Sequence, residues 1–548
     1  MFARIKKSGK YQYLQIVENK KVQGKVKQRV IATVGRMDRL QSKGEVETLV
    51  RSLSRFSDKV LLVLSGKSDV TVNSRKIGPA LIFERLWNEL GIKKAIRQVL
   101  FGRKFQFDVE RAIFLTTLHR LIVSGSDRSC EKWKRDYVIN GTDRLELHHL
   151  YRAMAFLGEP LEDQSDALPF GPRCIKDKIE EQIFTSNRDL FSSLELVFFD
   201  TTSIYFEGDG GQDIGRYGHS KDHRPDLKQM VVGVVIDDQG RPICCEMWPG
   251  STADVKTLIP LAERLKKRFH IGRFCIVADR GMFSASTVED LNKKNLLYIL
   301  GTRMRKVNRI KHDILSRGGR FKEVYPEKTS SRAPAPLKVK EVWQEGKRYI
   351  VCLNPKQARK DSAAREAIIE ALKEKITRAP KSMIGNKGFR RYLKISRDSV
   401  SIDTARIKEE ARYDGKWVLE TNSDLSPEEV ALSYKELWQV EHVFRDMKSV
   451  LETRPVFHQR DDAIRGHVFC SFLALMLRKE LLRRLEEAGH DLEWSDIIQD
   501  LEALQQTDIE ENGKRLAVRT ECQGTCGKVF KAVRVAVPPT IREVPEGV

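Results

Sequence analysis

Residues 194–200 read LELVFFD, a mostly apolar run that ends on the carboxylate of Asp200. Residues 274–279, FCIVAD, repeat this pattern and end on Asp279. Apolar runs of this length are typical of strands that are buried on both faces of a sheet. Adjacent strands in one sheet could bring the two carboxylates together at one edge, although an acid at a strand end can also cap the next helix.

Three more apolar runs and two amphipathic helices complete this region. The strands are expected at residues 194–199, 231–236, 242–247, 274–278 and 297–300. The turn at 237–240 predicts that the second and third strands form a hairpin. A helix is expected at about 254–269, and a capping box of Ser286 and Glu289 is expected to start a second one. This order of elements predicts a mixed sheet with helical crossovers.

A third acid lies far along the chain, within a segment of helical periodicity. Tyr434, Glu441 and Lys448 are separated by seven residues each, so on one helix they share a face, with Arg445 one turn beyond Glu441. An acid beside a phenol and two cations suits a metal site that binds phosphate. The alternative is a surface glutamate with salt-bridge partners.

The formal charge and the cysteines narrow the classes of function. The net charge is +22, and the first 40 residues hold eleven Lys/Arg but only two acids. Such a surface attracts a polyanion, and we expect nucleic acid to be the partner. Nine scattered cysteines do not resemble a secreted disulfide framework, and no segment predicts a membrane span. We therefore expect a cytoplasmic, nucleoid-associated protein without a membrane partner.

Phosphodiester chemistry explains why three acids would be gathered. Two metal ions about 4 Å apart neutralise the phosphate, activate the attacking oxygen and stabilise the leaving oxygen. Carboxylates are the hard oxygen ligands that Mg²⁺ prefers.

Three stretches of this sequence resemble the DDE transposases of bacterial insertion sequences. They are VFFDTTSIYFEG at 197–208, CIVADRGMFS at 275–284 and SYKELWQVEHVFRDMKSVLETRPVFH at 433–458. The resemblance spans about residues 190–480, and a weaker one covers residues 8–36. The group in question has a β domain inserted in a ribonuclease-H-like core. The resemblance thus implies a multi-domain α/β chain with such a mixed-sheet core, preceded by a β-hairpin and a helical domain.

The resemblance also implies roles for individual residues. Asp200 would bridge two Mg²⁺ ions, for which Mn²⁺ substitutes, and Asp279 and Glu441 would each complete one site. The signature helix of the group commonly has an arginine where this chain has Leu437, so its phosphate contact is absent or comes from Arg445. The expected DNA-binding or phosphate-binding residues are Tyr434, Arg445, Lys448, Arg280, His219 and Lys221. The last two lie in a polar loop for which DNA contacts are favoured over zinc.

The implied activity is cut-and-paste transposition. The protein would bind the terminal inverted repeats of an insertion sequence as double-stranded DNA, cleave them and join them to a target, as a homodimer in the DNA complex. The alternatives are an inactive transposase-derived regulator and a structure-specific nuclease with the same metal core. In relatives an inserted-domain tryptophan can stack on a flipped base. Trp343 and Trp417 are the candidates here, although core packing is the expected role of both.

Domain boundaries follow from these patterns. We expect a basic β-hairpin region at 1–75, with strands at 11–18 and 25–34, and a helical DNA-binding domain at 76–190. The catalytic core would occupy 191–302 and resume with helices at 425–485. A β-rich domain would be inserted at 303–424, and 486–548 would form a C-terminal region.

Overall fold

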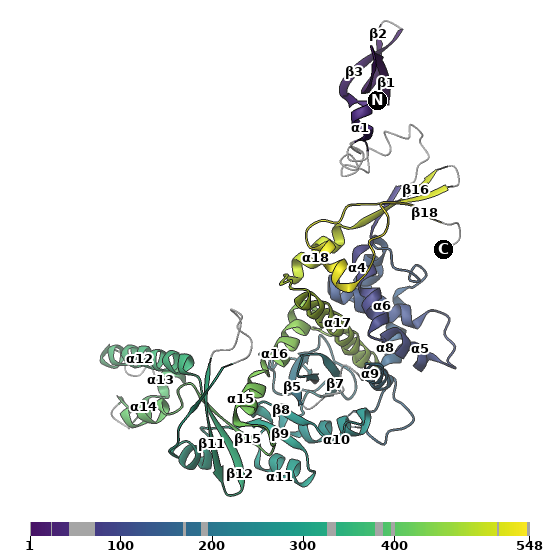
Figure 1. The fold of residues 1–548 in the computed structure, drawn as a ribbon. Coiled ribbons are helices and arrows are strands. Elements are labelled where there is room, and N and C mark those ends of the chain that lie inside the picture. Colours follow the sequence, from purple (N-terminus) through teal and green to yellow (C-terminus); the bar gives the residue numbers. More distant parts are fainter. Residues whose placement is uncertain are drawn as a thin grey trace. The chain divides into compact units, whose positions relative to one another are not determined.

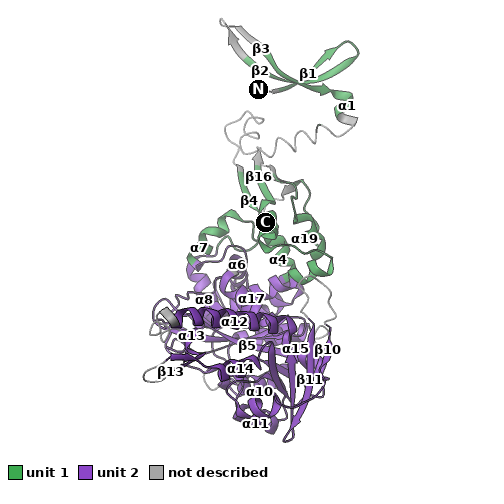
Figure 2. Ribbon diagram, turned by 90° about the vertical axis from the view of Figure 1, so that its left-hand side faces the viewer, with its two compact units in different colours: residues 1–86, 128–144, 481–548 green, residues 87–127, 145–480 purple. Residues whose placement is uncertain are grey.

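The computed structural model describes ten stretches of the chain, which separate into two compact units (Figure 2). The first unit comprises residues 1–86, 128–144 and 481–548, and the second comprises residues 87–127 and 145–480. The described residues are 2–22, 25–42, 46, 72–167, 171–187, 196–325, 336–378, 387–395, 400–511 and 514–544. Among the described helices, none has the length and apolarity needed to cross a membrane.

A nine-stranded mixed sheet forms the centre of the second unit (Figure 1). Its strand order is β10-β11-β12-β15-β9-β8-β5-β6-β7. Only the β5–β8 and β8–β9 pairs are parallel. The strands are β5 (Leu196–Tyr205), β6 (Gln229–Asp237), β7 (Pro242–Pro249), β8 (Cys275–Ala278), β9 (Leu297–Gly301), β10 (Lys322–Val324), β11 (Leu337–Gln344), β12 (Lys347–Leu353) and β15 (Lys416–Thr421).

The five strands expected in the core region all form, and β6 and β7 make the expected hairpin. The length of β5 differs from the expected length. β5 continues through Asp200 to Tyr205, so the expectation that Asp200 ends the strand is wrong. The extension is stabilised by pairing with β6, which continues as far as Tyr205, whereas β8 stops opposite Phe199.

One face of this sheet packs on helices α10 (Leu258–Phe269) and α11 (Ala285–Lys293) (Figure 1). Val197 and Phe199 of β5 join Ile276 and Ala278 of β8 in the apolar cluster that these helices cover. The N-cap of α11 is Ser284, whose hydroxyl accepts from the N–H of Thr287. The predicted capping box of Ser286 and Glu289 is therefore wrong, because α11 begins two residues earlier, after Ser284.

The helix expected around residues 427–451 is divided into three pieces. It consists of α15 (Pro427–Lys435), α16 (Trp438–Arg445) and a π-helical segment at Asp446–Val450. Ser426 and Glu429 form a capping box that starts α15. α15 packs against β8 and β9, and α16 packs against β5 and β6. Tyr434, Glu441 and Lys448 thus lie on three consecutive pieces rather than on one regular helix face.

Residues 303–424 contribute both to the main sheet and to a small separate core. The strands β10, β11, β12 and β15 continue the nine-stranded sheet beyond β9. α12 (Pro355–Arg378), α13 (Lys387–Arg390) and α14 (Thr404–Ala411) accompany the short hairpin of β13 (Leu393–Ile395) and β14 (Val400–Ile402). Leu372, Tyr392 and Leu393 form the buried centre of this subdomain.

Further helices form within residues 76–190 and 425–487. They are α4 (Gly78–Glu89), α5 (Ile92–Leu100), α6 (Val109–Ile122), α7 (Asp127–Trp133), α8 (Leu147–Leu157), α9 (Ile175–Ser186) and α17 (Asp461–Glu487).

The first unit contains two further sheets. β1 (Phe2–Ser8), β2 (Tyr11–Val22) and β3 (Lys25–Arg36) form an antiparallel three-stranded sheet, so the predicted two-stranded hairpin lacked β1. The other sheet has the order β18-β17-β16-β4. Its strands are β4 (Val72–Lys76), β16 (Gln505–Glu511), β17 (Lys514–Arg519) and β18 (Ile541–Val544), with α18 (Trp494–Ala503) and α19 (Cys526–Val533) in the same unit.

Candidate active site

Asp200 and Asp279 follow the last paired residues of two neighbouring parallel strands. The β5–β8 register ends at Phe199 opposite Ala278, so the next residue on each strand is an aspartate. Phe199 and Ala278 point into the apolar cluster beneath α10 and α11. Because side chains alternate along extended chain, both carboxylates point to the opposite face of the sheet.

Burial is the main influence on the Asp200 carboxyl group, and it raises the pKa to about 6. Two groups oppose this effect. The ammonium of Lys221 lowers the pKa, and so does the N–H of Thr201, which donates to Oδ1 at 2.7 Å. The neighbouring carboxylates of Asp279 and Asp254 act in the same direction as burial and contribute to this raised value. Asp200 is therefore a carboxylate in an environment that favours an added positive charge.

Asp254 is a further acid beside Asp200, and it is not among the site residues predicted from the sequence. It begins the 3₁₀ turn Asp254–Lys256, just after β7. Its Oδ1 accepts from the hydroxyl of Thr201 at 2.7 Å, and its Oδ2 lies 3.0 Å from Nζ of Lys221. Asp254 stands five residues after the end of β7 at Pro249, so it lacks the pattern of an acid directly after an apolar run that identifies Asp200 and Asp279.

Tyr434 reaches the sheet from α15 and contacts the second aspartate. Its hydroxyl donates to Oδ1 of Asp279 at 3.0 Å. Burial raises the pKa of Tyr434 above its ordinary value, and the charge of Asp279 adds to this effect. Gly301 on β9 makes the approach possible, because a Cβ there would lie 2.2 Å from the tyrosine hydroxyl.

Glu441 lies on α16, whose buried side packs on β5 and β6, while its own side chain is exposed. Among the described residues, only Asp127, His458 and His467 bring three potential ligand atoms within 4.8 Å of one another. The carboxylates of Asp200, Asp279 and Glu441 are therefore not drawn together to that degree.

The two predicted phosphate-binding lysines are both engaged in internal contacts. Nζ of Lys448 donates to Oδ1 of Asp222 at 2.8 Å, and that oxygen also lies 2.6 Å from Nη1 of Arg454. Nζ of Lys221 donates to the carbonyl and the hydroxyl oxygens of Thr201. These cations thus organise protein groups around the aspartates.

The other predicted contacts to DNA are solvent-facing. Arg445, Arg280 and His219 are exposed. Trp343 on β11 is 56% exposed, so the expectation that it packs in a core is wrong. Trp417 on β15 is half-buried, and its indole Nε1 has no hydrogen-bond partner within the described part of the chain.

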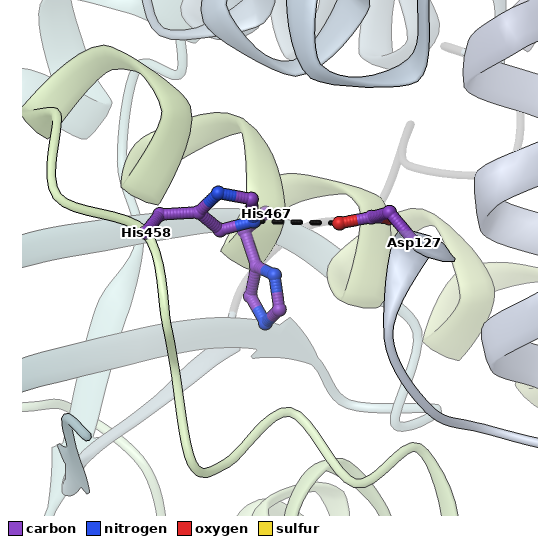
Figure 3. Close-up of side chains that lie close together, drawn as sticks. All are labelled: Asp127, His458 and His467. Carbon is purple, nitrogen blue, oxygen red and sulfur yellow. Dashed lines mark ion pairs between the residues drawn. The ribbon is translucent and has the colours of Figure 1, made fainter. Parts of the chain in front are cut away.

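The group of Asp127, His458 and His467 has the residue types of a metal site, but its surroundings argue against one (Figure 3). Nε2 of His458 lies 3.4 Å from Oδ2 of Asp127. The buried guanidinium of Arg120 lies 2.9 Å from Nδ1 of His467 and 3.4 Å from Asp127. A permanent positive charge at that distance repels a divalent ion. We interpret the group as a buried polar network.

Two family models match this sequence. The family described as transposase DDE domain matches residues 192–477, and the one described as IS1634 family transposase, N-terminal domain, matches residues 3–67. No curated protein matches the sequence.

The solved structures that match the chain include two transposase complexes. A cryo-EM structure of the piggyBac transposase synaptic complex with hairpin DNA has 10% identity and a TM-score of 0.36, covering 78% of this chain and 79% of that one. The Mos1 transposase paired-end complex with left transposon end has 13% identity and a TM-score of 0.14, covering 40% and 76%. The transposase DDE domain match extends over half of the sequence and contains Asp200, Asp279 and Glu441, so this chain belongs to the DDE transposases of bacterial insertion sequences, metal-dependent enzymes that cleave and join DNA.

Proposed function

We propose that this transposase binds the terminal inverted repeats of its insertion sequence and moves the element by cut-and-paste transposition. Asp200, Asp279 and Glu441 are the proposed ligands of two Mg²⁺ ions, for which Mn²⁺ substitutes. When bound, the ions supply charge neutralisation and activation of the attacking oxygen. The proposal rests mainly on one observation, the position of Asp200 and Asp279 on the same face directly after the last paired residues of β5 and β8.

The donor set suits such ions. Asp200 and Asp279 offer carboxylate oxygens, and the hydroxyl of Thr201 and the carboxylate of Asp254 lie beside them. These are hard oxygen groups, without the thiolate or imidazole ligands that zinc prefers. Glu441 is exposed on a helix that packs against the strand of Asp200. Rotation of its side chain toward the aspartates when DNA binds would complete the set.

The core is proposed to be ribonuclease-H-like, with residues 303–424 as its insertion. The hairpin of β6 and β7 beside β5, and the parallel strands β8 and β9 on its other side, support this assignment. The insertion would leave the core after β9 and return before α15. Its exposed Trp343 is available to stack on a base.

Each of the surrounding residues has a proposed task. Tyr434 holds Asp279 through its hydrogen bond, and this fixes one of the metal ligands. The exposed Arg445, Arg280 and His219 bind phosphates of the DNA. The helical segment at 76–190 and the basic N-terminal region recognise the transposon ends.

Two copies of the chain are proposed to pair the two ends in a homodimer, acting on the bacterial nucleoid in the cytoplasm. Pairing gives each active site one end to cleave. The net charge of +22 supports the long-range attraction to DNA that such an assembly requires.

Cleavage of a DNA fragment that carries the ends of the element tests the proposal. Asp200→Asn, Asp279→Asn and Glu441→Gln should each abolish cutting in Mg²⁺ or Mn²⁺ while binding of the ends persists. Glu436→Gln is a matched control, because this carboxylate accepts from the amide of Gln439 in the same segment. Retained cleavage by the Asp200 or Asp279 variant would overturn the proposed ligand set.

A further inference from the structure

Two consecutive residues, Lys221 and Asp222, reach in different directions from the loop between β5 and β6. Lys221 is held to β5 by its backbone and by its side chain. Its N–H donates to Oγ of Ser203 at 2.7 Å, and its Nζ donates to the carbonyl of Thr201 at 2.7 Å. The same ammonium lies 3.0 Å from Asp254. Lys221 thus connects the loop to the strand of Asp200 and to the neighbouring acid.

Asp222 connects the same loop to the segment that follows Glu441. Its side chain is 7% exposed. Oδ1 accepts a hydrogen bond from Nζ of Lys448 at 2.8 Å and lies 2.6 Å from Nη1 of Arg454. Its Oδ2 is buried and has no hydrogen-bond partner among the described residues. The guanidinium of Arg454 also lies over the ring of Tyr205, at the end of β5. The buried carboxylate of Asp222 therefore holds two cations, Lys448 and Arg454, from the segment that follows Glu441.

The position of Lys448 is tied to that of Glu441. α16 passes directly into the π-helical segment Asp446–Val450, so the backbone between the two residues is continuous helix. The chain beyond Lys448 is anchored as well, because the N–H of Val456 donates to the carbonyl of Tyr205 and the N–H of Glu207 donates to the carbonyl of Val456. Restraining Lys448 and Arg454 against the loop therefore restrains the helix of Glu441 against β5.

We propose that Lys221 and Asp222 are positioning residues, a two-residue clamp that sets the helix of Glu441 against the strand of Asp200. This inference rests on the proposed function, because it matters only if Glu441 and the aspartates act together. Lys221 fixes the strand side of the clamp, and Asp222 fixes the helix side. Loss of either contact displaces a metal ligand without removing it.

In a competing account Asp222 is inhibitory, because its ion pair with Lys448 keeps this cation from binding DNA. The two accounts predict different effects of Asp222→Asn on the cleavage rate and on the affinity for DNA. Without the carboxylate, a released Lys448 would bind DNA more tightly and would preserve or raise the rate. A clamp that is lost would instead lower the rate of cleavage at saturating DNA while leaving the affinity for DNA nearly unchanged.

Single-turnover cleavage by the full chain separates these outcomes. Asp222→Asn keeps the shape and removes the charge, and it should lower the rate at saturating DNA by roughly 10- to 100-fold, since small displacements of reacting groups have effects of this size. The dissociation constant for the DNA end should stay nearly unchanged, because the Asp222 carboxylate is buried within the protein. Asp226→Asn is the control, because this exposed acid of the same loop pairs with Arg224 and should leave both quantities unchanged.

Combined variants test whether the two residues act as a unit. Lys221→Met should resemble Asp222→Asn, and the double variant should be little slower than either single variant, because effects within one unit are not additive. Multiplicative losses would overturn the clamp. An unchanged rate, or a faster one with tighter DNA binding, in Asp222→Asn would also overturn it.

Two further variants keep the test decisive. If Asp222→Asn does not fold, Arg454→Met decides, since it leaves the pair of Asp222 and Lys448 in place. A rate loss at unchanged affinity supports the clamp, and an unchanged rate overturns it. Asp200→Asn is the reference for the proposed function. If Asp200→Asn still cleaves DNA, the assignment of the metal site is wrong. If Asp200→Asn is inactive and Asp222→Asn is fully active, only the proposed clamp is wrong.

Discussion

The smallest change with a large expected effect is a single methyl group at Gly301. Its Cβ would lie 2.2 Å from the hydroxyl of Tyr434, so in Gly301→Ala the tyrosine must leave Asp279. We expect a loss of about 1–3 kcal/mol of stability, typical of overpacking, and much slower cleavage. Gly272→Ala is the matched control, because nothing lies within 4 Å of its Cβ. Urea denaturation and cleavage assays measure both effects, and equal behaviour of the two variants would contradict the close approach.

The hydroxyl of Tyr434 can be removed without a steric change. Tyr434→Phe leaves the ring on α15 but takes away the hydrogen bond to Oδ1 of Asp279. A hydrogen bond to a charged group contributes about 1.5–3 kcal/mol, which corresponds to a loss of roughly 10- to 100-fold in an equilibrium or a rate. We expect the cleavage rate to fall within this range and the Mg²⁺ concentration for half-maximal rate to rise. A Mg²⁺ titration of wild type and variant measures this, and identical curves would mean that Tyr434 does not hold Asp279.

At the scale of elements, the face of the sheet away from the acids is joined to α9 by a buried ionic network. Arg268 of α10 pairs with Glu180 of α9 at 2.7 Å and with Glu246 of β7 at 3.0 Å. Arg264, also on α10, lies 2.7 Å from Asp177 of α9. The guanidinium of Arg268 is fully buried, and it shares Glu246 with Arg264 and Glu180 with Lys176.

Removal of this arginine should destabilise the fold strongly. Arg268→Met removes one of the cations that neutralise the buried carboxylates of Glu180 and Glu246, and breaking a buried ion pair typically costs about 3–5 kcal/mol in the free energy of unfolding. Arg273→Met breaks an exposed pair with Asp424 and should cost at most about 1 kcal/mol. Chemical denaturation of the full chain compares them. Equal losses would show that the buried network contributes no more than a surface pair.

At the scale of the whole molecule, charge governs the approach to DNA. With a net charge of +22, we expect affinity for the element's ends to fall steeply with salt. If about six to ten phosphates are contacted, the loss between about 50 and 200 mM salt is roughly 10³- to 10⁵-fold. Binding measured by fluorescence anisotropy at several salt concentrations gives the slope. A flat response would contradict an interface that rests on phosphate contacts. Removal of divalent ions with a chelator should stop cleavage and leave this binding intact.

The sequence alone determined the strands of the core and the positions of its two aspartates. Buried strands need consecutive apolar residues, so LELVFFD and FCIVAD identify β5 and β8 without knowledge of their partners. The helices on either side follow equally local rules of periodicity. Asp200 and Asp279 were found because each stands directly after such an apolar run.

Only the tertiary structure decided which side chains surround these acids. β15 pairs with β9, more than a hundred residues earlier, and β5 extends past Asp200 because β6 lies beside it. Asp254 and Asp222 became visible as parts of the site only through Thr201, Lys221 and Lys448. Local patterns fix the backbone of a strand or helix, whereas contacts between distant segments depend on how the sheet is ordered and how helices pack on it, and no local pattern encodes that order.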